Sequence, residues 1–170
     1  MPIADFEKQL EGAVENVEDA DDILDRNKEL ILDYKRDQVL NGLSEATLLR
    51  NTQRLKIVAQ QAGKPFDEMA KSDVKDLVEW LHKQDYTAET VYTYKNVMRT
   101  FWKWMDPTDD GEAPPEVAWI TMNPPNGNGD TLPKDLLTKE EVEDQVDAAK
   151  NPRDKALIYL LYETGARIGE

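Results

Sequence analysis

The stretch TAETVYTYKNVMRTFWKWM, residues 87–105, holds the strongest amphipathic pattern in the chain. Its large apolar residues recur at spacings of three and four, which is the period of one face of an α-helix. Pro107 follows two residues after Met105, and proline ends a helix because it has no N–H and clashes with the preceding turn. The pattern therefore predicts a long helix that packs by one face, and the residues of that face are Val91, Tyr94, Met98, Phe101, Trp102 and Met105.

Three further helices are predicted before this one. They cover roughly residues 23–40, residues 44–63 with Ser44 as a suitable N-cap, and a segment that begins near Ser72. Residues 23–106 are thus expected to form a four-helix, all-α domain. The expected inward residues are Leu24, Ile31 and Tyr34 in the first helix, Leu48, Leu55, Val58, Ala59 and Ala62 in the second, and Val74, Leu77, Val78 and Leu81 in the third.

The segments on either side of this domain have a different composition. Residues 1–22 contain eight acidic residues against one lysine, which indicates an acidic tail or helix. Residues 107–135 are rich in Pro, Gly, Asn and Asp and are predicted to be a linker, with a short extended segment at 117–120.

Helices are expected to resume at Leu137. Thr138 and Glu141 have the spacing of a capping box, and Val142, Val146 and Ala149 follow on one face. After Pro152 a further helix is predicted to end at Gly165 in a left-handed conformation. Its apolar stripe is Ala156, Leu157, Leu160 and Leu161.

The composition narrows the class of protein. The 170 residues include 35 acidic and 21 Lys and Arg side chains, for a net charge of −14. Such acidity is typical either of a well-solvated surface or of a high-salt cytoplasm, where screening acts within about 3 Å at 1 M salt, and composition does not separate the two. The chain has no cysteine and one histidine, His82, so neither a disulfide, a metal site nor a cofactor is expected. With no long apolar run and no signal-like start, a soluble, cytoplasmic protein without a membrane partner is expected.

The positive charge is concentrated on two of the predicted helices. Residues 44–63 and 87–105 each carry a net charge of +2, so the remaining 131 residues carry −18. Thr47, Arg50 and Arg54 share a face of the one helix, away from its apolar stripe. In the other, the residues away from the stripe are Thr93, Asn96, Arg99 and Lys103. These residue types contact phosphates and base edges in DNA complexes, although ordinary solvated helix faces have the same composition.

The last ten residues, LYETGARIGE at 161–170, closely resemble the Thr-Gly-x-Arg-x-x-Glu segment of tyrosine recombinases, the phage-integrase family with its Xer-like and archaeal groups. LPKDLLTKEEV at 132–142 resembles the entry into that family's catalytic domain, and RDKALIYLL at 153–161 resembles the helix before its arginine. Ser44-x-x-Thr47, Thr87-x-x-Thr90-x-x-x-Tyr94 and Phe101-x-x-Trp104 are similar to its core-binding domain. The likeness spans about residues 25–170.

The resemblance implies a fold, an activity and a partner. The fold is a SAM-like core-binding domain over 23–106, a linker over 107–135, and the first helices of a catalytic domain over 136–170. The activity is site-specific recombination and integration of duplex DNA through a phosphotyrosyl intermediate. Arg167 would be the first catalytic arginine and would stabilise the phosphate in the transition state, with Glu170 supporting its placement. Full-length relatives act as tetramers on two DNA sites.

The same resemblance implies that further catalytic residues are needed. The family's Lys, His-x-x-Arg element and nucleophilic Tyr would lie beyond Glu170, so this chain alone is expected not to recombine DNA and to be a fragment or a truncated product. The expected DNA contacts from residues 44–63 are Thr47, Arg50, Gln53 and Arg54, and those from residues 87–105 are Thr90, Thr93, Asn96 and Arg99.

Two alternatives stay open beside the recombinase hypothesis. One is a non-catalytic DNA-binding module, or remnant, that occupies recombination sites without cutting them. The other is an acidic helical interaction protein that does not meet DNA. The gene beyond codon 170 separates an enzyme from a module, since a downstream His-x-x-Arg and Tyr would favour the enzyme.

Overall fold

A computed structural model describes residues 5–109, 111–123 and 137–165 of the chain. All the regular secondary structure in these ranges is helical, which confirms the all-α prediction for them. The chain divides into two compact units, residues 1–125 and residues 126–170.

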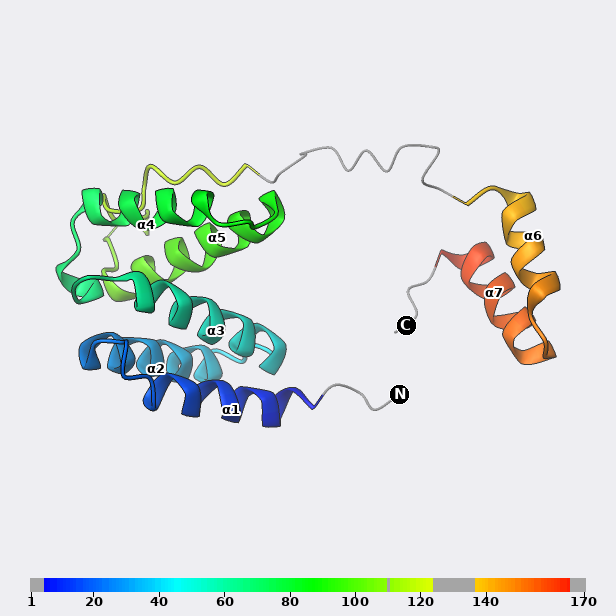
Figure 1. The fold of residues 1–170 in the computed structure, drawn as a ribbon, viewed down its shortest axis with the longest axis horizontal. Coiled ribbons are helices and arrows are strands. Elements are labelled where there is room, and N and C mark those ends of the chain that lie inside the picture. Colours follow the sequence, from blue (N-terminus) through cyan, green and yellow to red (C-terminus); the bar gives the residue numbers. More distant parts are fainter. Residues whose placement is uncertain (1–4, 110, 124–136, 166–170) are drawn as a thin grey trace. The chain divides into compact units, whose positions relative to one another are not determined.

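The first unit is a bundle built around α3 (Glu45–Gln61). Helices α1 (Phe6–Glu18) and α2 (Asp25–Leu40) lie along one side of α3 (Figure 1). A short 3-10 helix, η1 (Phe66–Glu68), leads to α4 (Lys71–Lys83) and α5 (Ala88–Met105) on the other side, and α5 contacts α2, α3 and α4. The four predicted helices are therefore α2 to α5, and α3 and α5 are neighbours.

The ends of these helices follow from local hydrogen bonds. Thr87 caps α5, because its Oγ1 accepts the backbone N–H of Thr90 at 3.2 Å. Gly42 follows α2 with a φ of 74°, a left-handed conformation that glycine adopts without a Cβ clash. Ser44 is the N-cap residue of α3, as predicted, but its hydroxyl lies 3.1 Å from the Thr47 hydroxyl and does not cap a backbone N–H.

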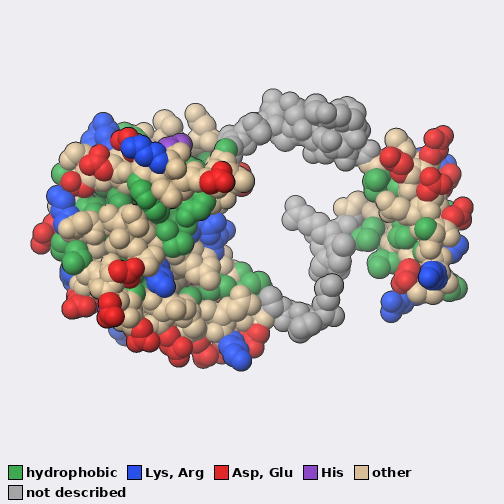
Figure 2. All heavy atoms as spheres, in the orientation of Figure 1, with side chains coloured by type: hydrophobic (Ala, Val, Ile, Leu, Met, Phe, Trp, Pro, Cys, Tyr) green, Lys and Arg blue, Asp and Glu red, His purple; other side chains and the backbone are tan. Residues whose placement is uncertain are grey.

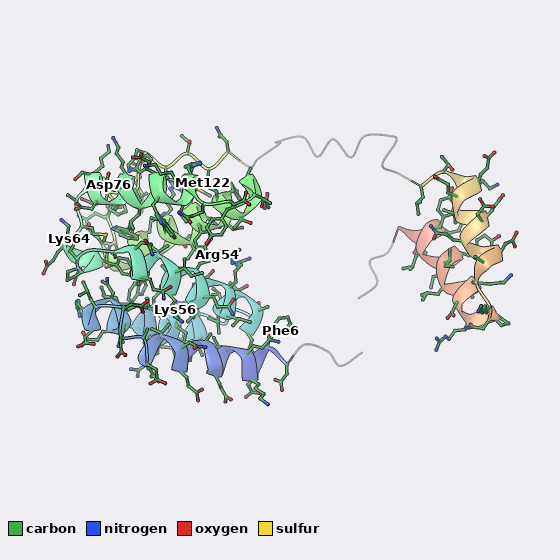
Figure 3. The ribbon with its side chains drawn as sticks, viewed as in Figure 1. Phe6, Arg54, Lys56, Lys64, Asp76 and Met122 are labelled. Carbon is green, nitrogen blue, oxygen red and sulfur yellow. The ribbon has the colours of Figure 1, made fainter. Side chains whose placement is uncertain are left out.

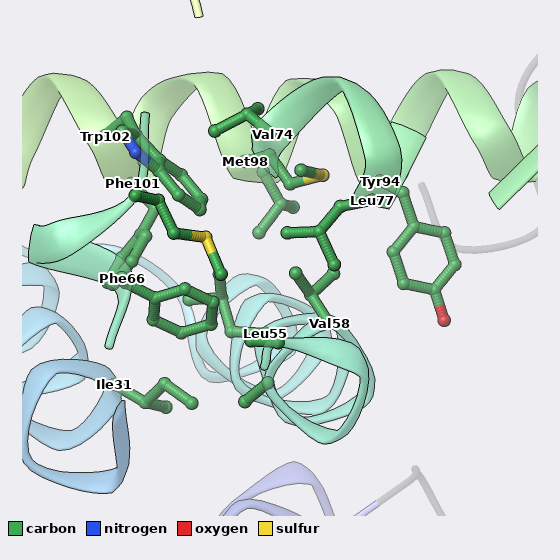
Figure 4. Packing of buried hydrophobic residues seen from close by; sticks show 14 of the residues in the cluster. Ile31, Leu55, Val58, Phe66, Val74, Leu77, Tyr94, Met98, Phe101 and Trp102 are labelled. Atoms are coloured by element: carbon green, nitrogen blue, oxygen red, sulfur yellow. The ribbon is translucent and has the colours of Figure 1, made fainter. Parts of the chain in front are cut away.

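The core of the first unit centres on aromatic side chains from α5 and η1 (Figure 4). Phe66, Phe101 and Trp102 are fully buried, and the Phe101 ring meets those of Tyr34 and Phe66 edge-on, with ring centroids 5.2 and 5.3 Å apart. Such edge-to-face pairs stabilise a core by about 0.5–1.5 kcal/mol beyond the area they bury. The apolar stripe of residues 87–105 is thus confirmed as the centre of the core, with Met105 half-buried at its end.

One prediction of an inward-pointing residue in the first unit is wrong. Leu24 is 42% exposed, whereas its neighbour Ile23 is buried. The reason is that Leu24 is the N-cap of α2 and has extended backbone angles, so it does not continue the helical face. The other residues predicted to point inward from α2, α3 and α4 are buried.

The acidic segment at the start of the chain is a packed helix. In α1, Leu10, Ala13 and Val17 are buried, and the first two pack against Leu48 and Leu49 of α3. Its carboxylates occupy the other face. The high local charge therefore coexists with a narrow apolar stripe that anchors the helix.

Part of the segment predicted as a linker packs on the core. Val117 and Ile120 are buried among the core residues. The backbone there turns instead of extending, because the Val117 N–H donates to the Pro114 carbonyl at 3.0 Å and the Ile120 N–H donates to the Val117 carbonyl at 2.9 Å. The expectation of an extended segment at 117–120 is therefore wrong, since turn hydrogen bonds prevail over β propensity.

The second unit contains α6 (Lys139–Ala148) and α7 (Pro152–Thr164), which pack on each other. The predicted capping box is confirmed, since Thr138 Oγ1 accepts the Glu141 N–H and the Glu141 carboxylate accepts the Thr138 N–H. Gly165 ends α7 with a φ of 62°, as predicted. Among the described residues of the second unit, the buried side chains are Val142 and Val146 of α6. The predicted apolar stripe of α7 is exposed or half-buried.

Candidate nucleic-acid interface

Arg54 lies where α3 and α5 run next to each other (Figure 3). Its Nη2 donates a hydrogen bond to the Thr93 hydroxyl of α5 at 3.2 Å. Its guanidinium carbon stands 5.4 Å from the centre of the Tyr94 ring, within the range of a cation–π contact. The side chain is half-buried, so α5 holds an arginine of α3 in one place.

The electrostatics around Arg54 are unusual for a protein this acidic. Burial lowers the pKa of the Arg54 guanidinium from its ordinary value, and Tyr94 acts in the opposite direction. The positive charge of Arg50, one turn earlier on α3, also lowers that pKa, so the two guanidinium groups repel each other. No carboxylate of the described residues pairs with either arginine. The pair therefore forms a local cationic site without a compensating anion from the described part of the chain.

Tyr94 provides the aromatic wall of this site. Its ring stacks on that of Tyr86, with centroids 5.5 Å apart. Burial raises the pKa of Tyr94 to about 12, and the Tyr86 hydroxyl acts in the same direction, so Tyr94 stays protonated at neutral pH. A neutral, buried ring is a suitable face for a guanidinium.

The same lack of ion pairs extends along both helices. Between residues 5 and 165, the described ion pairs involve basic residues of α2, α4, α6, α7 and the turn before η1. None involves the basic side chains of α3 and α5, which are Arg50, Arg54, Lys56, Lys95, Arg99 and Lys103. Figure 2 shows acidic side chains gathered along α1, while basic side chains lie over α3 and also over α4. The charges are therefore sorted between neighbouring helices.

The structure brings together some of the predicted contact residues and separates others. Arg54 and Thr93 are joined by a hydrogen bond at the α3–α5 junction, and Arg50 lies one turn before Arg54 on α3. Gln53 is exposed on another side of α3, in a surface hollow that α1 also lines. Asn96 is exposed on α5 without a side-chain hydrogen bond among the described residues.

The remaining predicted residues lie at the helix starts or further along α5. Thr47 and Thr90 bond the hydroxyls of Ser44 and Thr87, so both belong to the first turns of their helices. Arg99 is half-buried, and its Nε has no partner within the described part of the chain. Arg167, the predicted catalytic arginine, lies outside the described residues.

The sequence predicts Tyr94 as a core residue and predicts no role for Tyr86. Tyr94 is buried, as predicted, but its ring also faces Arg54. A signal for this exists in the sequence, since Tyr94 is adjacent to Thr93 and lies at the border of the apolar stripe. That the ring faces Arg54 is not visible in the sequence, because this contact depends on how α3 and α5 are rotated relative to each other.

Comparisons with other proteins add no relative. No protein-family model, curated protein or solved structure matches the chain. Within the described ranges, no group of His, Asp and Glu side chains is arranged to hold a metal ion. Among the same residues, no helix has both the length and the apolar character needed to cross a bilayer.

Proposed function

We propose that the chain binds duplex DNA through the α3–α5 face centred on Arg50 and Arg54. The observation that carries this proposal is the placement of two arginines one turn apart on α3 without a carboxylate partner among the described residues, in a protein of net charge −14. Leaving two arginines to repel each other costs free energy that an anion would recover. DNA phosphates are such anions, and arginine binds them through paired hydrogen bonds.

The distribution of charge supports the same proposal. The carboxylates of α1 would repel a duplex, whereas the basic side chains of α3 and α5 would attract it. Such sorting orients an approaching polyanion toward one face of an otherwise acidic protein. Hydroxyls and amides beside the arginines, such as Thr93 and Asn96, are able to donate to phosphates or base edges.

The test is a titration of a fluorescent duplex of mixed sequence, followed by anisotropy over a series of salt concentrations. The variant combines Arg50→Ala and Arg54→Ala. The logarithm of the wild-type binding constant should fall linearly with the logarithm of salt concentration, because bound phosphates release counterions. The double variant should bind at least about tenfold more weakly at low salt and should lose roughly one to two units of that slope.

The matched control removes the same charge elsewhere, through Arg36→Ala on α2 and Lys71→Ala on α4. Both residues are exposed, and neither pairs with a carboxylate among the described residues. The control should keep the wild-type slope. Circular dichroism at each salt concentration verifies that every variant is folded. A wild-type binding constant without salt dependence would refute DNA binding and leave an acidic interaction protein as the better hypothesis.

We further propose that this DNA contact serves site-specific recombination, with the family resemblance of residues 132–170 as its support. In that role the first unit would hold the duplex, and Arg167 would bind the scissile phosphate. The alternative is a module that occupies such sites without cutting. Sequencing the gene beyond codon 170 separates the two, since only the recombinase requires a downstream His-x-x-Arg and a nucleophilic Tyr.

A further inference from the structure

Resting on the proposed DNA binding, we propose that Arg54 reads a base edge, a guanine in the major groove, while Arg50 contacts a phosphate. Thr93 and Tyr94 are then positioning residues that aim Arg54. The two arginines are one helical turn apart on α3 and carry the same charge, so their surroundings are what distinguishes them.

Arg54 is restrained at two points by α5. Thr93 accepts a hydrogen bond from Nη2 at 3.2 Å, and the Tyr94 ring lies 5.4 Å from the guanidinium carbon. A long side chain normally loses rotamer freedom when it binds, and a side chain that is already held loses less. Base readout requires a donor pair in fixed geometry, so this pre-ordering favours discrimination between bases.

The donors that Arg54 keeps suit guanine. Nε is buried and has no hydrogen-bond partner among the described residues, so the end of the guanidinium, Nη1 and Nη2, is the part able to reach a ligand. Nη2 carries two hydrogens, and the bond to Thr93 uses one of them. One hydrogen of Nη2 and both hydrogens of Nη1 are therefore without a partner among the described residues. Guanine presents O6 and N7 as two adjacent acceptors in the major groove, and a paired contact from arginine is the commonest specific readout.

Arg50 differs from Arg54 in its exposure and in its lack of a restraining partner. It is exposed, and no described residue accepts a hydrogen bond from it. An unrestrained guanidinium follows a phosphate along the backbone of any sequence, which contributes affinity without base discrimination. Its repulsion with Arg54 also disfavours both side chains reaching for the same acceptor.

Tyr94 is able to position Arg54 because it is itself fixed. The ring is 5% exposed and stacks on Tyr86 with a centroid distance of 5.5 Å. The face toward Arg54 is therefore set by core packing and not by the ligand. Removing the ring face should release Arg54, whereas removing only the hydroxyl should not.

The experiment selects bound duplexes from a library with a randomised central segment and sequences them, using the whole chain. Wild type should enrich guanine at one or more positions. Arg54→Lys keeps the charge but not the paired donors, so it should reduce that enrichment about tenfold and leave the salt slope of binding unchanged. Arg50→Lys, the matched control, should keep the enrichment.

Positioning is tested by a pair of variants at residue 94. Tyr94→Phe retains the ring and should retain the guanine enrichment, whereas Tyr94→Leu should lose most of it at an unchanged salt slope. If Tyr94→Leu proves unfolded by circular dichroism, Thr93→Val replaces it, because it removes the acceptor for Nη2 and leaves the core residue in place. Thr100→Val, on the same helix, is its control.

The outcomes separate this inference from the proposed function. A negative salt slope together with an enrichment that Arg54→Lys leaves intact would overturn the inference and leave DNA binding standing. A negative slope with no base enrichment in wild type would do the same. Binding without salt dependence would remove the proposed function, and the inference with it.

Discussion

Asn27 on α2 holds the turn that leads into η1, and its replacement should weaken the whole first unit. The side chain is fully buried. Its Oδ1 accepts the backbone N–H of Phe66 at 2.7 Å, and its Nδ2 donates to the Lys64 carbonyl at 3.3 Å. Because residues 64–66 leave the helical hydrogen-bond pattern at this point, the amide side chain supplies the partners that a helix would otherwise supply.

In Asn27→Ala the Phe66 N–H stays buried, since Phe66 itself is fully buried in the core. A buried donor without a partner costs about 1–3 kcal/mol, and loss of the longer bond to Lys64 adds about 0.5–1 kcal/mol. We therefore expect the free energy of unfolding to fall by about 2–4 kcal/mol. For a domain with a typical stability of about 5–15 kcal/mol, this is a large part of the total.

The measurement is urea unfolding at constant salt, followed by tryptophan fluorescence, because the Trp102 ring lies 5.3 Å from that of Phe66. The urea dependence of the unfolding free energy should match that of wild type, which shows that the same surface is exposed. Asn41→Ala is the matched control. Asn41 also donates to a backbone carbonyl, that of Asp37 at 2.8 Å, but at an exposed site, so its loss should cost under about 0.5 kcal/mol.

The reasoning would be refuted if Asn27→Ala unfolded within about 0.5 kcal/mol of wild type or of the Asn41→Ala control. Amide hydrogen exchange gives a second, independent readout. The Phe66 amide should exchange faster in Asn27→Ala even under conditions where the chain remains folded, because its acceptor is gone.

Two further predictions concern helix ends. Gly42→Ala should lower the free energy of unfolding by about 1–2 kcal/mol in urea titrations, because a Cβ is strained at a φ of 74°. Gly63→Ala is the control and should be near neutral, since Gly63 has no positive φ and a Cβ there has free space. Equal losses at both sites would contradict this reasoning. At the start of α4, hydrogen bonds from Lys64 and the Ala70 N–H hold the pKa of Asp73 below its ordinary value of 3.8, so its stabilisation is present above that pH and is lost as the pH falls through the lower folded-state value. In thermal melts, Asp73→Asn should have a lower melting temperature than wild type at neutral pH, and this difference should shrink below about pH 4. A difference that does not change with pH would exclude this role of Asp73.

Much of the helical framework can be predicted from residue spacing alone. The apolar stripes of residues 44–63, 72–83 and 87–105 are local patterns, and a helix converts spacing into a face whatever the rest of the chain does. The same holds for the capping box at Thr138 and for the left-handed stop at Gly165, which depend on neighbouring residues only. The concentration of positive charge on two helices is likewise a property of the sequence.

Other features depend on partners far apart in the chain. The burial of Val17 and Val117 is not predictable from a charged segment or a proline-rich segment, because it requires a core surface formed elsewhere. In the sequence, Asn27 is an ordinary polar helix residue. Its role follows only from its hydrogen bonds to the backbone of Lys64 and Phe66 in the structure. Long-range packing determines these features, because it alone sets which polar groups are buried away from water and which buried donors lie beside an acceptor.

The candidate site divides along the same line. Residue type and spacing alone place Arg50 and Arg54 on one face of a basic helix. The family resemblance on which the recombination proposal rests is likewise a property of the sequence. Only the tertiary structure puts Thr93 and the Tyr94 ring against Arg54, 39 and 40 positions along the chain, and so distinguishes it from Arg50. The physical reason is that the rotation and separation of two packed helices are set by the interlocking of their core side chains, and this interlocking is a property of both surfaces together.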